Sequence, residues 1–132
     1  MQVHLRADVV LCGLSFGLPT LRHRAFELAG WQAPQPRHIS HRGHLTAGWR
    51  HGHVRTFEPS ECPACGNWHR ATVYGVYGRG GGKPTVDQAR HALGIDWTRD
   101  PDALNEAIPP AYTHHLGTAL RACLSFDREV AA

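Results

Sequence analysis

Long hydrophobic segments are absent from this sequence of 132 residues. No apolar run approaches the roughly 18–20 residues that a transmembrane helix needs. Residues 1–6, which open the chain, lack the apolar core of a secretory signal peptide. Cysteine is scarce, with four residues, and nothing in the sequence suggests export to an oxidising compartment. We therefore expect a cytoplasmic protein.

Extremes of composition are also absent. Hydrophobic residues make up 42% and charged residues 19%, as in ordinary globular proteins, while 14 glycines and 9 prolines favour a loop-rich chain. The glycine-rich residues 80–83 are not a phosphate-binding loop, because Tyr77 stands where Gly-x4-Gly-Lys needs its first glycine and Pro84 replaces Ser or Thr. The length fits one domain or one half of a larger one.

Acidic residues are few in the middle of the chain, where positive charge gathers. Arg and Lys counted against Asp and Glu give +1 for residues 1–30, +5 for residues 31–84 and −3 for residues 85–132. A basic segment that is also rich in Gly, His and Trp suits a surface laid against phosphates, because neutralising phosphates releases counterions. On charge alone, a merely solvated polar loop is the alternative interpretation.

The hydrophobic pattern predicts three strands in the first two thirds of the chain. The first is a continuous apolar run of the kind buried on both faces of a mostly parallel sheet. In the second, alternation places Arg22 and Arg24 on one face together. The three strands are expected near residues 8–13, 24–29 and 71–77.

Helices are expected in the last third. Thr85 with Gln88 three residues later is a capping-box pattern, and Gly94 supplies the stop. Two further helices should span about residues 101–107 and 109–124, with prolines at their first positions. Together these elements predict an α/β piece that lacks the strands a doubly wound sheet needs.

An arginine pair follows the first apolar run. Leu-Cys-Gly-Leu-Ser-Phe-Gly-Leu at residues 11–18 precedes Leu-Arg-His-Arg-Ala-Phe-Glu at residues 21–27. This stretch is similar to the Gln-x-Arg-x-Arg element of cytosine-5 DNA methyltransferases, especially the compact versions found in bacteriophages. Arg22 and Arg24 take the two arginine positions, and Thr20 stands at the glutamine position.

Two later stretches resemble closing motifs of the same family, in the same order. Residues 83–97 are similar to the Arg-x-Leu-Thr-x-x-Glu segment that supports the target-recognition region, with Lys83 near the arginine position. Residues 107–112 are similar to the last motif, Gly-Asn-Ala-Val-Pro-Pro, whose helix closes over the S-adenosylmethionine pocket. Asn105 and Glu106 occupy its Gly-Asn places.

The resemblance implies the C-terminal part of a Rossmann-like methyltransferase fold with a small, loop-rich target-recognition insert. Residues 1–30 would end the catalytic-domain sheet, residues 31–82 would form the basic insert, and residues 83–132 would form the helical closing segment. The implied partner is double-stranded DNA, and the implied cofactor is S-adenosylmethionine.

The resemblance also implies roles for single residues. Arg22 and Arg24 would hold the flipped cytosine through its carbonyl oxygen and the adjacent phosphate; on periodicity alone they could equally decorate a solvent-facing strand edge. Ala107, Ile108 and Pro109 would contact S-adenosylmethionine. The candidates for contact with DNA bases and phosphates are Arg37, Arg42, Arg50, Arg55, Arg70, Lys83 and Thr85.

The catalytic residues of that family are missing. Its chemistry needs a thiolate that attacks C6 and a carboxylic acid near N3, which the family carries as Pro-Cys and Glu-Asn-Val in its first half. None of the four cysteines follows a proline, and no Glu-Asn pair occurs. We therefore expect a chain that is inactive alone and completes an N-terminal half carried by a separate chain, in a bacterial or phage-infected cell.

A cysteine knuckle lies inside the basic segment. Cys62 and Cys65 are followed by His69 four positions on, with His51 and His53 about ten residues before. This spacing suits structural, tetrahedral Zn²⁺ held by Cys62, Cys65, His69 and either His51 or His53. The alternative is a reduced cysteine pair in a loop with surface histidines.

The remaining cysteines and histidines suggest no site. Cys12 and Cys123 are expected to be small buried hydrophobes. The scattered histidines, which carry no assignment, include His38, His41, His44, His114 and His115.

Two other functions compete with the methyltransferase part: a stand-alone, zinc-stabilised DNA-binding module and an inactive truncated remnant.

Overall fold

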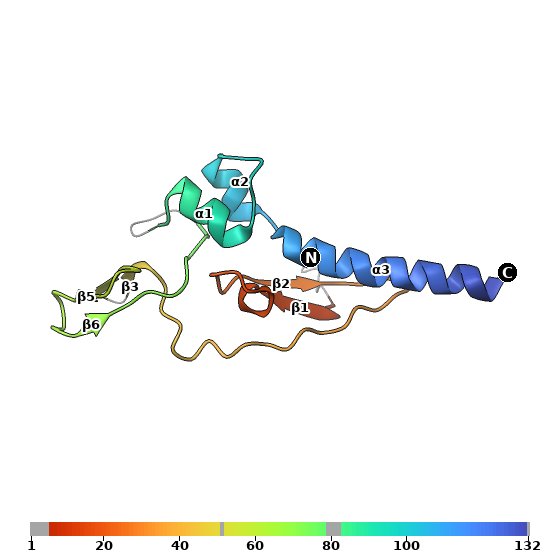
Figure 1. The fold of residues 1–132 in the computed structure, drawn as a ribbon, viewed down its shortest axis with the longest axis horizontal. Helices are drawn as coiled ribbons and strands as arrows, with labels where there is room; N and C mark the ends of the chain where they lie inside the picture. Colours follow the sequence, from red (N-terminus) through yellow and green to blue (C-terminus); the bar gives the residue numbers. More distant parts are fainter. Residues whose placement is uncertain (1–5, 51, 79–82, 132) are drawn as a thin grey trace, which may run out of the picture.

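The structure is a computed structural model that describes residues 6–50, 52–78 and 83–131. Within these ranges, three antiparallel strand pairs precede three α-helices (Figure 1). The strand pairs are β1 (Val9–Cys12) with β2 (His23–Phe26), β3 (Gly48–Arg50) with β4 (His53–Arg55), and β5 (Ser60–Glu61) with β6 (Trp68–His69). The helices are a 3-10 turn, η1 (Gly13–Phe16), followed by α1 (Val86–Leu93), α2 (Pro101–Glu106) and α3 (Pro110–Ala131).

The β1–β2 hairpin carries the arginine pair. Its register places Val9 opposite Phe26 and Cys12 opposite His23. Between the strands, η1 approaches the backbone so closely that a Cβ on Gly13 would collide with the carbonyl oxygen of Thr20. Only glycine therefore fits at the start of this turn.

The two strands predicted in this region are confirmed, but their setting differs from the prediction. The ladder partner of β1 within the described residues is β2, which runs antiparallel. Val10 is 38% exposed, so β1 is not buried on both faces. Val9 and Leu11 pack on the core, and Val10 between them lies at the surface although it is apolar. The run is therefore continuously apolar without being buried on both faces. Assignment to a Rossmann-like fold stays a prediction.

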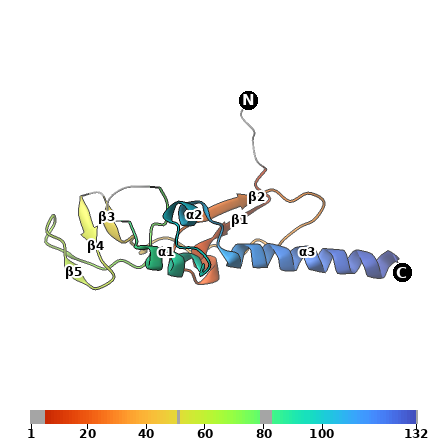
Figure 2. The ribbon, with the colours of Figure 1, turned by 90° about the horizontal axis from the view of Figure 1, so that it is seen from above.

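The start of α3 packs against this hairpin. Val9, Leu11 and Leu28 form a buried cluster with Tyr112, which lies in the first turn of α3. The ring of Phe16 lies 5.2 Å from that of Tyr112, centroid to centroid. The rest of α3 extends away from the hairpin in both views (Figures 1 and 2). Its far end exposes large apolar side chains at Leu124, Phe126 and Val130.

Helices α1 and α2 form a second small core. Thr85 caps α1: its hydroxyl accepts from the Gln88 amide at 3.2 Å, while Gln88 Oε1 accepts from the Thr85 amide at 2.9 Å. Gly94 ends the helix in the left-handed region, at φ 69°. Buried Val76, Ala89, Ala92, Leu93, Ile95 and Leu104 fill the space between the helices. The three predicted helices are thus confirmed, with α3 reaching Ala131.

The prediction of a third strand at residues 71–77 is wrong. The sole β contact of this segment in the described residues is an isolated parallel bridge between Val73 and Thr46. Its backbone hydrogen bonds go to three different segments, since the Ala71 amide donates to the Thr56 carbonyl, the Thr72 amide to the Leu45 carbonyl and the Tyr74 amide to the Pro19 carbonyl. The alternating apolar residues of this segment are buried, as Val73 is, but no strand pairs with the segment in the part of the chain that the structure describes.

Among the residues that the structure describes, no helix is both long and apolar enough to cross a membrane.

Candidate functional site

The predicted cysteine knuckle brings four possible metal ligands together. The side-chain ligand atoms of His53, Cys62, Cys65 and His69 all lie within 4.8 Å of one another, and we call this group the knuckle cluster. His53 Nδ1 is 3.4 Å from Cys62 Sγ, and His69 Nε2 is 3.1 Å from Cys65 Sγ. His51, the alternative ligand, lies outside the described residues.

A tight turn shapes this cluster. The amides of Cys65 and Gly66 both donate to the Cys62 carbonyl, and Gly66 has φ 69°, which favours glycine. The pairing of β5 with β6 then brings His69 back beside the turn, while β4 supplies His53. Two thiolates and two imidazoles are a ligand set that suits tetrahedral zinc. The cluster could hold a metal ion.

A second Cys/His group, which the sequence did not predict, lies at the hairpin. The ligand atoms of Cys12, His23, His38 and His41 also lie within 4.8 Å of one another, and we call this group the hairpin cluster. Cys12 Sγ is 3.3 Å from His41 Nε2, and His23 Nε2 is 3.1 Å from His38 Nε2. Cys12 is buried as expected, but its sulfur faces a histidine.

The ligands of the hairpin cluster come from three segments. Cys12 and His23 are opposite each other in the hairpin register, and His38 and His41 lie on the loop that follows β2. Burial first, and then the proximity of His23 and His38, hold the pKa of His41 below its usual range. The neutral imidazole, which is the form that binds metals, is therefore favoured. The His-x-x-His spacing was the one local signal in the sequence.

Arg22 is buried, with 8% of its surface exposed. Its Nη1 donates to the Val76 carbonyl at 2.5 Å, and its Nη2 donates to the Asn105 carbonyl. Burial lowers the pKa of its guanidinium, followed by the effect of neighbouring Arg24. Arg24 is only partly buried and donates to the His23 carbonyl at 3.1 Å. Arg22 precedes β2 and its guanidinium is held by carbonyls, whereas Arg24 lies within the strand, and both residues line one cavity. That both arginines grip the target base stays a prediction.

Tyr112 secures the backbone of Arg22. Its hydroxyl donates to the Arg22 carbonyl, and burial raises the pKa of that hydroxyl above its usual range. The start of β2, the end of the basic insert, the end of α2 and the start of α3 therefore meet at one arginine. A cavity of about 340 Å³ opens beside it, lined by residues 20–24, Thr46 and residues 74–77, and we call it the arginine pocket.

We expect Tyr112→Phe to lower the free energy of unfolding by about 1–3 kcal/mol, because the Arg22 carbonyl loses its buried donor. Urea denaturation measures this change. Ser125→Ala is the matched control: it removes an exposed hydroxyl from the same helix and should cost less than about 0.5 kcal/mol. Equal stability of Tyr112→Phe and the unmutated chain would show that the hydroxyl contributes nothing.

Five of the predicted DNA-contacting residues are spread over the basic insert, and the other two, Lys83 and Thr85, follow it. Arg37, Arg42 and Arg70 are exposed, and Arg55 is partly buried. Arg50 lies in β3, and its side chain is outside what the structure describes. The Lys83 ammonium lies 3.9 Å from the centroid of the Tyr77 ring and donates to the Tyr77 carbonyl. Their contacts with DNA stay predictions, as does that of Thr85, whose hydroxyl caps α1.

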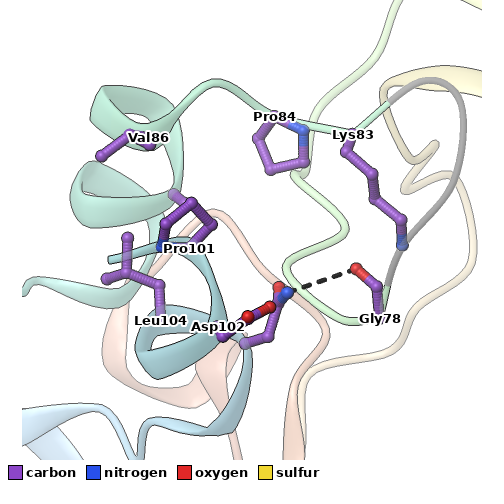
Figure 3. Close-up of a pocket in the computed structure, with 9 residues that line it drawn as sticks. Gly78, Lys83, Pro84, Val86, Pro101, Asp102 and Leu104 are labelled. Atoms are coloured by element: carbon purple, nitrogen blue, oxygen red, sulfur yellow. Dashed lines mark hydrogen bonds between the residues drawn. The ribbon is translucent and has the colours of Figure 1, made fainter. Parts of the chain in front are cut away.

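The predicted cofactor-contacting residues, 107–109, connect α2 to α3. Ile108 is 41% exposed, whereas Pro109 is buried. A separate cavity of about 410 Å³ lies between α1 and α2, and includes Lys83, Asp102 and Leu104 in its lining (Figure 3). Asn105 closes one side of it by donating to the Gly78 carbonyl at 3.3 Å.

Comparisons of the chain with protein-family models, with curated proteins and with solved structures found no match. The chemistry of the chain has to be inferred from its own residues.

Proposed function

We propose that this chain is the DNA-contacting, C-terminal part of a DNA (cytosine-5) methyltransferase. The main support for this proposal is that distant segments of the chain meet at Arg22. The arginine pair, the end of the basic insert at Val76 and the Asn105 backbone before the Pro-Pro motif are far apart in sequence, yet one guanidinium bonds two of them to the third. The bond to Asn105 joins the first motif-like stretch to the last. Val76 adds the stretch at residues 83–97, because it packs in one cluster with Ala89, Ala92 and Leu93.

In this proposal the two arginines have different tasks. Arg22 is a positioning residue, since both of its terminal nitrogens are bonded to backbone carbonyls. Arg24, which is partly exposed and lines the arginine pocket, is the residue that would hold the flipped cytosine and its phosphate. The pocket volume of about 340 Å³ lies in the range of small-molecule sites.

The nucleophile and the acid would come from a catalytic half carried by a separate chain, because this sequence contains neither Pro-Cys nor Glu-Asn. S-adenosylmethionine, when bound, supplies the methyl group. Residues 107–109 fit one apolar wall of its pocket, since Ile108 is exposed and none of the three side chains is polar. The polar contacts to that cofactor would lie mainly in the other half.

Zn²⁺ is the ion we propose for the knuckle cluster. Four ligands close the coordination sphere, so the ion would be structural, with no open position for catalysis. It would stabilise a region whose strands β3, β4, β5 and β6 are only two or three residues long. Such short strands bury little apolar surface, and a metal supplies folding free energy that a core this small lacks.

Reconstitution tests the proposed function. The chain is combined with a methyltransferase half that carries the Gly-rich loop, Pro-Cys and Glu-Asn-Val, and transfer of a labelled methyl group to duplex DNA is measured. We expect transfer only when both chains are present. The single chain should bind duplex DNA, with an affinity that falls steeply as salt rises, because phosphate contacts release counterions.

The closed knuckle cluster in a basic segment favours one second candidate, a stand-alone zinc-stabilised DNA-binding module. The same experiment separates the two functions. Salt-sensitive DNA binding by the single chain, with no methylation in any combination, would support the module. Absence of both activities would identify an inactive remnant.

A further inference from the structure

We propose that the hairpin cluster, Cys12, His23, His38 and His41, is a second metal site that binds Zn²⁺. The site is distinct from the knuckle cluster, since the two clusters share no residue. The proposed site is independent of the methyltransferase role, because it rests only on the positions and chemistry of these four side chains.

Geometry is the first support. A tetrahedral ion with bonds of about 2.0–2.3 Å separates its ligand atoms by roughly 3.3–3.8 Å. In the hairpin cluster the distance from Cys12 Sγ to His41 Nε2, 3.3 Å, lies at the edge of this range, and the distance from His23 Nε2 to His38 Nε2, 3.1 Å, is slightly shorter. All four ligand atoms lie within 4.8 Å of one another, so small side-chain adjustments would complete the tetrahedron.

The chemistry of the group is the second support. Three imidazoles gather within 4.7–5.4 Å of one another, centroid to centroid, around a cysteine that is 1% exposed. A divalent cation would take one thiolate and three neutral imidazoles as its ligands, so that each of the four side chains would coordinate it.

The loop that carries His38 and His41 is held in place independently of any ion. Gln35 bonds the edge of β1 twice: its Oε1 accepts from the Val10 amide at 2.9 Å, and its Nε2 donates to the Val10 carbonyl at 2.7 Å. The Ser15 hydroxyl donates to the Arg37 carbonyl at 3.0 Å. These contacts deliver the two loop histidines to the hairpin, as a prepared site requires.

The position of the ion suggests its task. His23 stands between Arg22 and Arg24, and its carbonyl accepts from Arg24. A metal bound by His23 and by the loop would fix β2 against the start of the basic insert. With four protein ligands it would be a structural ion, and it would reduce the freedom of the strand that presents Arg24.

Metal content tests the proposal. The full chain, loaded with Zn²⁺ and freed of excess, is weighed intact by native mass spectrometry. We expect two ions per chain, one in His38→Ala, and two in the control His114→Ala, which removes an exposed histidine outside both clusters. One ion in the unmutated chain, or two in His38→Ala, would overturn the second site.

Cobalt gives a readout that does not rely on variants losing metal. With Co²⁺ in both clusters, three thiolates bind, and each contributes to the thiolate-to-cobalt absorption band. Cys12→Ser should remove about a third of this band, and His38→Cys should raise it by about a third by adding a fourth thiolate. An unchanged band in both variants refutes the proposal whatever the methylation assay shows.

Discussion

Arg24→Ala should abolish methyl transfer when the chain is combined with a catalytic half that carries Pro-Cys and Glu-Asn-Val. Arg24 lines the arginine pocket, and its Nη1 donates to the His23 carbonyl oxygen at 3.1 Å. In the proposed role its remaining donors make charge-assisted bonds to the flipped base and the phosphate. Loss of such preorganised donors costs on the order of 100-fold or more in turnover. Initial rates of methyl transfer measure it.

Two further variants sharpen this experiment. Arg24→Lys keeps the charge but not the planar fork, so its rate should lie between those of the alanine variant and the unmutated chain. Arg121→Ala, which removes an exposed arginine from α3, should turn over normally. Near-normal transfer by Arg24→Ala would remove the residue from the site, even if the reconstituted pair is active.

Cys62→Ser should lose the metal of the knuckle cluster and unfold the region from β3 to β6. Cys62 is fully buried, its sulfur lies 3.4 Å from His53 Nδ1, and its carbonyl closes the knuckle turn. Structural zinc contributes on the order of 10 kcal/mol to folding of small metal-dependent units, which exceeds what strands this short can replace. Limited proteolysis should therefore cut between residues 48 and 70 much faster than in the unmutated chain.

Cys123→Ser is the matched control, because Cys123 lies on α3 and belongs to neither cluster. It should keep its metal content and its resistance to protease. The hairpin and α1–α2 should stay folded in Cys62→Ser, since their cores share no residue with the knuckle. Unchanged metal content and protease resistance in Cys62→Ser would exclude a structural ion at the knuckle.

Local signals made the helices and the knuckle predictable. The capping box of Thr85 and Gln88, with Gly94 as the stop, lies within ten residues and defines α1 by itself. Cys62 and Cys65 are similarly close in sequence, so their spacing alone places them in one turn, and the short β5–β6 pairing returns His69 to it. The choice of His53 required the β3–β4 pairing, which aligns that residue.

Features that depend on distant contacts were not predictable. Residues 71–77 alternate like a strand, but whether such a segment pairs in a ladder depends on its neighbours, and here its backbone bonds are shared among three segments, at Pro19, at residues 45–47 and at Thr56. The hairpin cluster needs the register that sets Cys12 opposite His23 and a loop that returns to the same place. Burial of Arg22 depends on carbonyls 54 and 83 residues away.

The bonds of Arg22 make tolerance to mutation unequal at the two ends of each contact. Its acceptors are main-chain oxygens of Val76 and Asn105, which every amino acid carries. Side chains at those two positions can change without removing an acceptor for Arg22, so the limits on them come from their other contacts, such as the packing of Val76 in the α1–α2 core. Arg22 has no such freedom, because no other side chain offers a planar fork of donors. One position thus bears the constraint for three segments.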